Sequence, residues 1–175
     1  MNVEGFAVRD NPPDRAPEKA RKWIEELEGK RFQVFPNLKS FAERLVKTNP
    51  RLPMERALFL SKYLTKTIKQ GGKSKVVMAA DPLHKLSDPY ALPKEYHYSF
   101  WEKIQAQCLL VYADQSEMNV WVQTDDLSKQ LQEWRSHFPK ESKWVTISDC
   151  GHMVHHEKPE ALACEILKFM SEDRS

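Results

Sequence analysis

Long apolar stretches and paired cysteines are missing from this sequence. No run approaches the roughly 18–20 apolar residues that a membrane-spanning helix needs. The N-terminus has no basic segment followed by an apolar core, so no secretory signal is predicted. There are three cysteines among 175 residues, and no Cys-x-x-Cys spacing occurs. An odd number of cysteines without that spacing indicates a reducing compartment, and we expect a cytoplasmic protein.

A strong excess of one charge is also missing. The formal net charge is +2, and the lysines and arginines are interspersed with acids. This pattern argues against a nucleic-acid-binding surface. The basic run at 66–75 is predicted to be a solvated loop. An apolar fraction of 41% and a charged fraction of 30% are ordinary for a globular chain. The length suits one domain, or one domain that lacks a part.

Helical patterns dominate residues 11–101, and strand patterns are almost absent there. Apolar residues recur at helical spacing in several runs, and asparagine, proline and glycine punctuate these runs. The expected helices begin at or shortly after Pro17, Asn37, Pro53 and Tyr96. Proline and aspartate interrupt the pattern over 81–90, which is predicted to be a loop.

From Gln107 onward the pattern changes to strands alternating with helices. Residues 108–113 form a continuous apolar run of strand length, typical of a sheet buried on both faces, and residues 143–147 form a second strand. Thr124 is expected to cap an intervening amphipathic helix. Pro159 opens a closing helix. This order predicts a parallel α/β unit with a right-handed crossover.

A single histidine follows the second of these strands in a tight turn. The chain reads Ser-Asp-Cys-Gly-His-Met over 148–153, directly before the helix that Pro159 opens. General bases of α/β enzymes lie at the carboxyl ends of parallel strands. His152 is therefore a candidate general base, and Asp149 is expected to shape the turn.

These strands, the Gly151-His152 turn and the closing helix resemble the last part of the α/β-hydrolase fold in order and spacing. The resemblance implies an α/β protein with a partial α/β-hydrolase fold, in which a short parallel sheet of about three strands is flanked by helices. Residues 1–10 would be the remnant of the sixth strand and its turn. Residues 11–104 would be a mainly helical cap, and residues 105–175 would be the C-terminal α/β unit.

The nucleophile of that family is not found in this chain. The family carries it in a Gly-x-Ser-x-Gly turn, and no pair among the five glycines frames a serine in this way. The resemblance places this turn before Met1. It implies a hydrolase of ester or similar acyl substrates that is truncated and inactive as given. The alternatives are a non-catalytic remnant or interaction protein, and a dehalogenase-type or epoxide-type hydrolase with an aspartate nucleophile.

By resemblance, His152 is the histidine of a nucleophile–histidine–acid triad, and the acid has two candidates. The commonest acid position, after the strand at 108–113, falls nearest Ser116, which is not a carboxylate. Asp114 lies slightly before that position. Some members place the acid after the sixth strand, where this chain has Glu4. We favour Glu4, with Asp114 as the other catalytic candidate.

The sequence also gives expectations about metals, cofactors and partners. His155 and His156 lie close to His152, but zinc needs further ligands, so we expect no metal and no cofactor. His84, in the loop at 81–90, is a weaker candidate to face the site. We expect a small-molecule substrate, no nucleic acid and no membrane. An uncovered strand edge at residues 2–4 would allow self-association.

Overall fold

The structure, a computed structural model, describes residues 1–27, 29 and 31–172. The chain divides into two compact units. One consists of Met1–Pro13 together with Leu92–Ser175, and the other consists of Asp14–Ala91. Among the described residues, no helix has the length and apolar character to cross a membrane.

The first unit contains the predicted parallel sheet. Its strands are β1 (Asn2–Val3), β5 (Leu109–Ala113) and β6 (Lys143–Ile147), in the order β1-β5-β6. Both pairings are parallel, and Asn2 lies opposite Leu110 in the register. The sheet of about three strands and the positions of its two later strands are thereby confirmed. Because β5 is central, its side chains are buried on both faces, as its continuous apolar sequence indicated.

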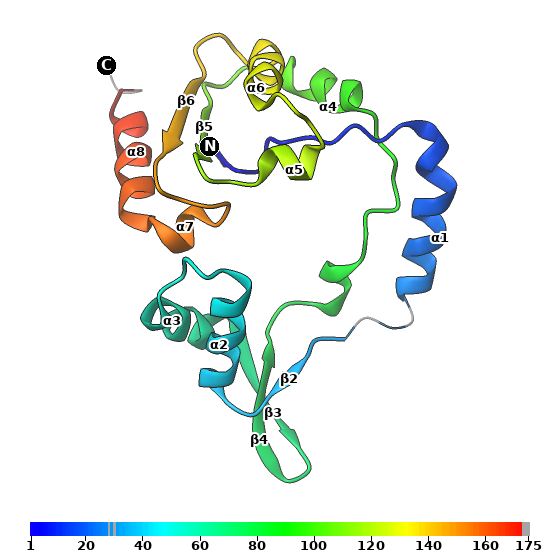
Figure 1. Cartoon of the computed structure of the whole chain (residues 1–175), viewed down its shortest axis with the longest axis vertical. Helices are drawn as coiled ribbons and strands as arrows, with labels where there is room; N and C mark the ends of the chain where they lie inside the picture. Colours follow the sequence, from blue (N-terminus) through cyan, green and yellow to red (C-terminus); the bar gives the residue numbers. More distant parts are fainter. Residues whose placement is uncertain (28, 30, 173–175) are drawn as a thin grey trace. The chain divides into compact units, whose positions relative to one another are not determined.

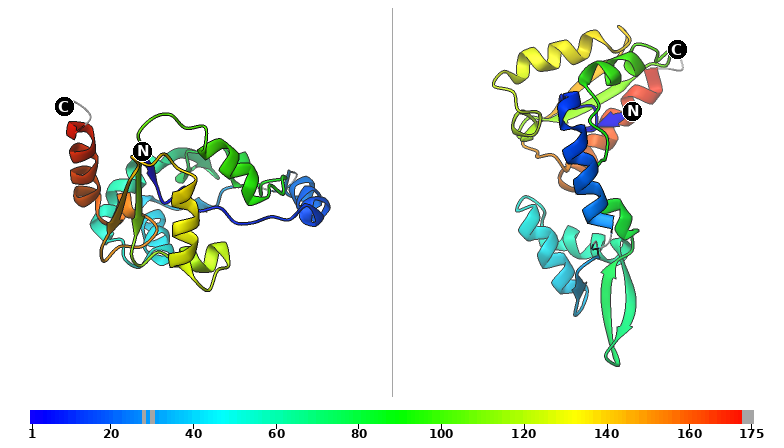
Figure 2. Two further views of the ribbon diagram at one scale, coloured as in Figure 1. Left: turned by 90° about the horizontal axis from the view of Figure 1, so that it is seen from above. Right: turned by 90° about the vertical axis from the view of Figure 1, so that its right-hand side faces the viewer.

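Helices cover both faces of this sheet (Figures 1 and 2). On one face, Leu110 packs with Phe6 and Trp134. On the opposite face, Leu109 and Val111 join a second apolar cluster that contains Leu162. The first cluster involves α4 (Lys94–Trp101), α5 (Met118–Val122) and α6 (Leu127–Ser136), and the second involves α7 (Val154–Glu157) and α8 (Pro159–Glu172). The layers are those of an α/β domain.

One detail of this unit differs from the sequence expectations. The helix α6 begins two residues later than expected, because Asp126 and not Thr124 is its N-cap and accepts a hydrogen bond from the Lys129 backbone N–H at 2.9 Å. Thr124 Oγ1 instead accepts from the Asp126 N–H at 3.2 Å. The helix α4 packs through Tyr98 into the core beside the sheet. The role of residues 11–104 as a cap stays a prediction.

A polar cluster joins α4 to α6 beside this core. Glu133 Oε1 accepts hydrogen bonds from Lys94 Nζ at 2.7 Å and from Tyr98 Oη at 3.0 Å, and Glu133 Oε2 accepts from Gln130 Nε2 at 3.0 Å. The hydrogen bond from Lys94 is the main cause that lowers the pKa of Glu133 below its ordinary value of 4.5. Burial, followed by the bond to Glu133, raises the pKa of Tyr98.

The lowered pKa of Glu133 predicts a pH dependence of stability. In the window below pH 4.5 the unfolded chain binds a proton at this carboxyl before the folded chain does. The stability contributed by Glu133 is therefore present above pH 4.5 and is lost as the pH falls through the folded pKa. The free energy of unfolding, measured with urea from pH 7 to pH 3, should fall less steeply for Glu133→Gln than for the unchanged chain. Equal slopes for the two proteins would contradict this prediction.

The second unit contains the predicted helices together with an antiparallel sheet. Asn37 caps α2 (Leu38–Thr48) by accepting a hydrogen bond from the Ser40 N–H at 2.9 Å, and the helix that was expected after Pro53 is confirmed as α3 (Met54–Leu64). No residue of α1 (Ala16–Leu27) is buried. The described elements of this unit are α1 (Ala16–Leu27), β2 (Val34–Phe35), α2 (Leu38–Thr48), α3 (Met54–Leu64), β3 (Thr65–Gln70), β4 (Lys73–Met78) and η2 (Pro82–Lys85), and η1 (Pro13–Arg15) spans its first boundary in the sequence.

The loop predicted over 66–75 is wrong, because this run forms the hairpin of β3 and β4 (Figure 2). Gly71 and Gly72 have φ values of +59° and +73°. Two positive φ angles in a two-residue connection match the twist of a β-hairpin. Val76 packs against Phe35 and Phe41. The β-branched residues of this run favour strands. The many lysines between them indicated a solvated loop instead.

Candidate functional site

The turn that carries His152 follows the carboxyl end of β6. Asp149 has a φ of +51°, in the left-handed region, and its carboxylate pairs with Lys158 Nζ at 2.9 Å. The Gly151 backbone N–H donates to Glu157 Oε2 at 2.8 Å, and Cys150 is buried. These contacts fix the turn from both sides. The side chain of His152 remains 66% exposed at the end of the sheet.

Glu4 lies at the carboxyl end of the neighbouring strands, directly after β1. Its backbone N–H donates to the Val111 carbonyl at 2.9 Å, which extends the pairing of β1 with β5. Its φ is +57°, and L-residues other than glycine, asparagine and aspartate rarely adopt this left-handed conformation. The side chain of Glu4 is only 3% exposed. A charged group in this position requires close polar partners.

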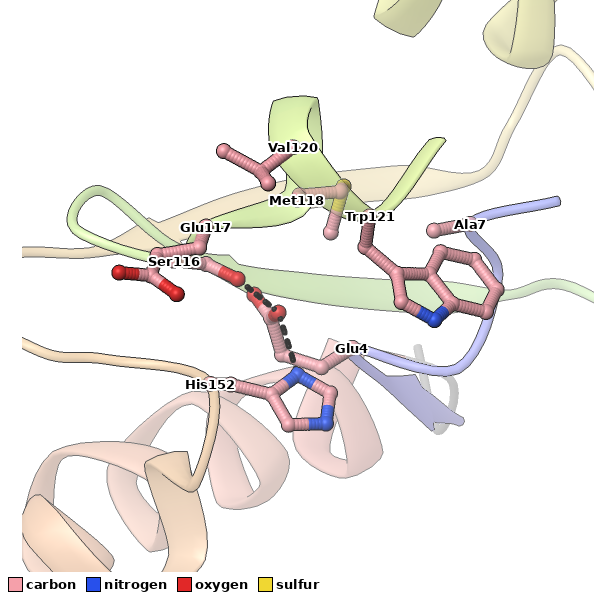
Figure 3. A pocket seen from close by; sticks show the side chains of 8 residues that line it. All are labelled: Glu4, Ala7, Ser116, Glu117, Met118, Val120, Trp121 and His152. Carbon is pink, nitrogen blue, oxygen red and sulfur yellow. Dashed lines mark hydrogen bonds and ion pairs between the residues drawn. The ribbon is translucent and has the colours of Figure 1, made fainter. Parts of the chain in front are cut away.

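The Glu4 carboxylate has a partner at each oxygen (Figure 3). Oε1 accepts from the Ala113 backbone N–H at 2.5 Å, and Oε2 accepts from Ser116 Oγ at 2.6 Å. Oε2 also lies 3.0 Å from His152 Nδ1. An ionised carboxylate is acceptor-only, so the shared proton belongs to Nδ1. The neutral imidazole then has its unprotonated nitrogen at Nε2, the arrangement that a general base requires.

Asp114, the other carboxylate that the sequence suggested, points elsewhere. It is exposed, and its Oδ1 accepts from the Cys150 backbone N–H at 3.3 Å. Asp114 therefore supports the turn before His152, whereas Glu4 contacts the imidazole. The hydrogen bond from Ser116 to Glu4 was not predicted. The signal for this contact in the sequence is that Ser116 occupies the commonest acid position of the family without being a carboxylate.

A pocket of about 470 Å³ opens beside the Glu4–His152 pair. Its polar side is formed by Glu4, Ser116, Glu117 and His152. Its apolar side is formed by Ala7, Met118, Val120 and Trp121, most of them from α5 (Figure 3). This volume is within the range of about 300–1,000 Å³ that is typical of small-molecule sites. Sequence patterns did not indicate α5, because a five-residue helix is too short to show a periodicity.

Among the described residues, the other histidines do not line the pocket beside Glu4 and His152. Within residues 1–27, 29 and 31–172, no group of three or more His, Cys, Asp or Glu side chains is placed to hold a metal ion. His155 and His156 lie on α7 with their ring centroids 4.2 Å apart. Burial is the main cause that lowers the pKa of His156. His84 lies on η2 in the other compact unit, and its role stays a prediction.

Comparison with solved structures identifies folds similar to this one. No protein-family model matches the sequence, and no curated protein gives a significant match. A thioesterase domain from the curacin biosynthetic pathway superposes with a TM-score of 0.72 and 22% identity, covering 95% of this chain and 56% of that domain. A hypothetical protein from Pseudomonas aeruginosa gives a TM-score of 0.72, 18% identity, and coverages of 94% and 55%.

An esterase from Mycobacterium tuberculosis is also similar, with a TM-score of 0.62, 15% identity, and coverages of 90% and 48%. A peroxisomal α/β-hydrolase from Saccharomyces cerevisiae has a TM-score of 0.59 and 12% identity, with coverages of 97% and 46%. The chain thus spans about half the length of the solved proteins that it matches. Together with the parallel β1-β5-β6 sheet between two helical layers, these similarities show that the chain has a partial α/β-hydrolase fold.

Proposed function

We propose that this chain supplies the histidine and the acid of a hydrolytic active site that acts on ester or similar acyl substrates. The observation that carries the proposal is the 3.0 Å contact between His152 Nδ1 and Glu4 Oε2 at the carboxyl end of the parallel sheet. The neighbouring folds include a thioesterase, an esterase and a hydrolase, and this supports acyl chemistry.

In this proposal His152 is the general base and acid. Its Nε2 takes the proton from a nucleophilic hydroxyl as the oxygen attacks the acyl carbon, and it then returns the proton to the leaving group. Water repeats the sequence and releases the acid. Glu4 holds the imidazole in the required tautomer and stabilises the imidazolium that forms in each step.

The nucleophile would come from a segment outside this sequence, which has no Gly-x-Ser-x-Gly turn. Ser116 does not fit this role, because its hydroxyl donates to Glu4 Oε2, the oxygen next to His152 Nδ1. A nucleophile has to reach Nε2 instead. The cap role of residues 11–104 and the truncated, inactive state of the chain are parts of the same proposal.

Purified 175-residue chain should hydrolyse short-chain aryl esters no faster than a His152→Ala variant, and a serine-directed phosphonate should not label it. The reading frame upstream of Met1 is then examined for a Gly-x-Ser-x-Gly or Gly-x-Asp-x-Gly turn. A longer protein that includes this turn should hydrolyse esters, and both Glu4→Gln and His152→Ala should lower its kcat strongly. Full activity of either variant would contradict the proposal, and an upstream aspartate would favour the dehalogenase or epoxide class.

A non-catalytic interaction protein is the second candidate, and the edge position of β1 favours it. Among the described residues, β1 pairs with β5 and with no other strand. An open strand edge can pair with another chain. Sedimentation of the same purified sample distinguishes the cases: a concentration-dependent dimer that disappears on Val3→Pro would support this candidate, and a monomer would oppose it.

A further inference from the structure

The short helix α5 presents large apolar side chains on both of its faces. Met118 is 4% exposed and packs into the core with Val122. Val120 is 67% exposed and Trp121 is 58% exposed, although both are apolar. The inward residues are four positions apart and therefore share one face of the helix. Val120 and Trp121 are consequently held outward by the packing of Met118 and Val122.

This outward face is fixed in place beside the Glu4–His152 pair. Gln123 ends α5 in the left-handed conformation with a φ of +60°. Its Oε1 accepts a hydrogen bond from Arg9 Nη2 at 2.7 Å, and this bond ties α5 to the segment that follows β1. Ala7 belongs to that segment and completes the apolar wall with Trp121 (Figure 3). The wall is thus built from two elements that also position the acid.

The two sides of the pocket differ in chemistry, and this difference selects a class of ligand. The lining residues include two acidic ones, Glu4 and Glu117, and no lysine or arginine is among the described lining residues. An anionic ligand would therefore be repelled. Burying the exposed indole and the valine against an apolar group would be favourable.

We propose that this pocket binds an uncharged acyl or aryl ester, with its apolar group against Val120 and Trp121 and its carbonyl group toward His152. The proposal rests on the proposed function, because it names the substrate class of the same site. A ligand with a free carboxylate, including the acid that hydrolysis releases, binds more weakly. The acidic residues on the polar side thus favour the uncharged substrate over the anionic product.

Methyl hexanoate and hexanoate are suitable probes, because they differ in charge and share one apolar chain. Each is titrated into the full 175-residue chain while the indole N–H signal of Trp121 and the ring signals of His152 are followed by NMR. Methyl hexanoate should shift both sets of signals with one dissociation constant, and hexanoate should bind about tenfold more weakly or worse. Trp121→Ala should weaken the binding of methyl hexanoate about tenfold.

Phe59→Ala is the matched control, because Phe59 is a comparably exposed aromatic residue at 59% and lies in the other unit. It should leave the dissociation constant unchanged. Trp121→Phe, which retains an aromatic surface, should restore most of the affinity lost in Trp121→Ala. Circular dichroism checks that each variant is folded.

Several results would overturn this subsite: no shift of the Trp121 signal, equal affinity for hexanoate and its ester, or equal affinity of Trp121→Ala and the unchanged chain. These results are independent of the nucleophile. Methyl hexanoate could bind as expected although a longer protein that carries a nucleophile does not exist. In that case the proposed function fails and the binding site stands. If methyl hexanoate does not bind but the longer protein hydrolyses esters through His152, the binding site fails and the proposed function stands.

Discussion

Replacing Trp134 with alanine is expected to destabilise the unit that contains the parallel sheet by about 3–5 kcal/mol. Trp134 is completely buried, and its ring contacts Phe6 edge-on with the centroids 5.9 Å apart. Phe6 also contacts Trp144, with the two ring centroids 5.0 Å apart. Truncation removes the largest side chain of this cluster and leaves a cavity that rigid neighbours fill only in part. The loss is a large share of a typical domain stability of about 5–15 kcal/mol.

Urea denaturation followed by circular dichroism measures this loss. Trp121→Ala is the matched control, because it removes the same side-chain type from an exposed position on α5 and should change the unfolding free energy by less than about 1 kcal/mol. Trp134→Phe should be less destabilising than Trp134→Ala because it leaves a smaller cavity. A Trp134→Ala loss no larger than that of Trp121→Ala would show that α6 is not packed on the sheet as described.

Replacing Glu4 with glutamine is expected to change which ring nitrogen of His152 carries the proton. The glutamine amide can still accept from the Ala113 N–H through Oε1, so the strand contact survives. The other end becomes an NH₂ group that donates, and it faces Ser116 and His152 Nδ1. His152 then accepts at Nδ1, and the proton moves to Nε2. In serine proteases the equivalent wrong tautomer lowers kcat about 10⁴-fold, and we expect a loss of this order in any longer, active protein.

Long-range ¹⁵N–¹H NMR of the imidazole at pH 8, where most imidazoles are neutral, reports the tautomer directly in the 175-residue chain. Asp114→Asn is the matched control, since Asp114 was the alternative acid and its carboxylate contacts the Cys150 N–H. It should leave the Nδ1–H form unchanged. A tautomer change in Asp114→Asn but not in Glu4→Gln would assign the acid to Asp114.

Most of the regular elements could be predicted from the sequence because burial leaves a periodic pattern. The apolar run of β5 and the amphipathic patterns of α2, α3 and α8 were sufficient to place them. Elements without such a pattern were missed. The helix α5 has five residues, and the exposed hairpin β3–β4 has lysines where a half-buried strand would show alternation.

The candidate site could be predicted only in part, because its contacts join distant segments. His152 was visible in the sequence from its glycine turn after a strand. Glu4 is 148 positions away, and periodicity contains no information about that contact. Resemblance to a known fold suggested Glu4 and left Asp114 as a competitor. The hydrogen bonds to Ala113 and Ser116, which distinguish the two carboxylates, depend on side-chain geometry that no spacing rule describes.

The parallel pairing of β1 with β5 also constrains the order in which the site can form. Asn2 and Leu110 are neighbours in the sheet, yet the whole Asp14–Ala91 unit lies between them in the sequence. Closing so long a loop has an entropic cost, which is smaller if the intervening unit has already folded and shortened the free chain. During synthesis Glu4 is made before β5, so its backbone hydrogen bond to Val111 cannot form until β5 has emerged. His152 follows later still, so the contact between His152 and Glu4 forms only after β5, β6 and the turn behind β6 have been made.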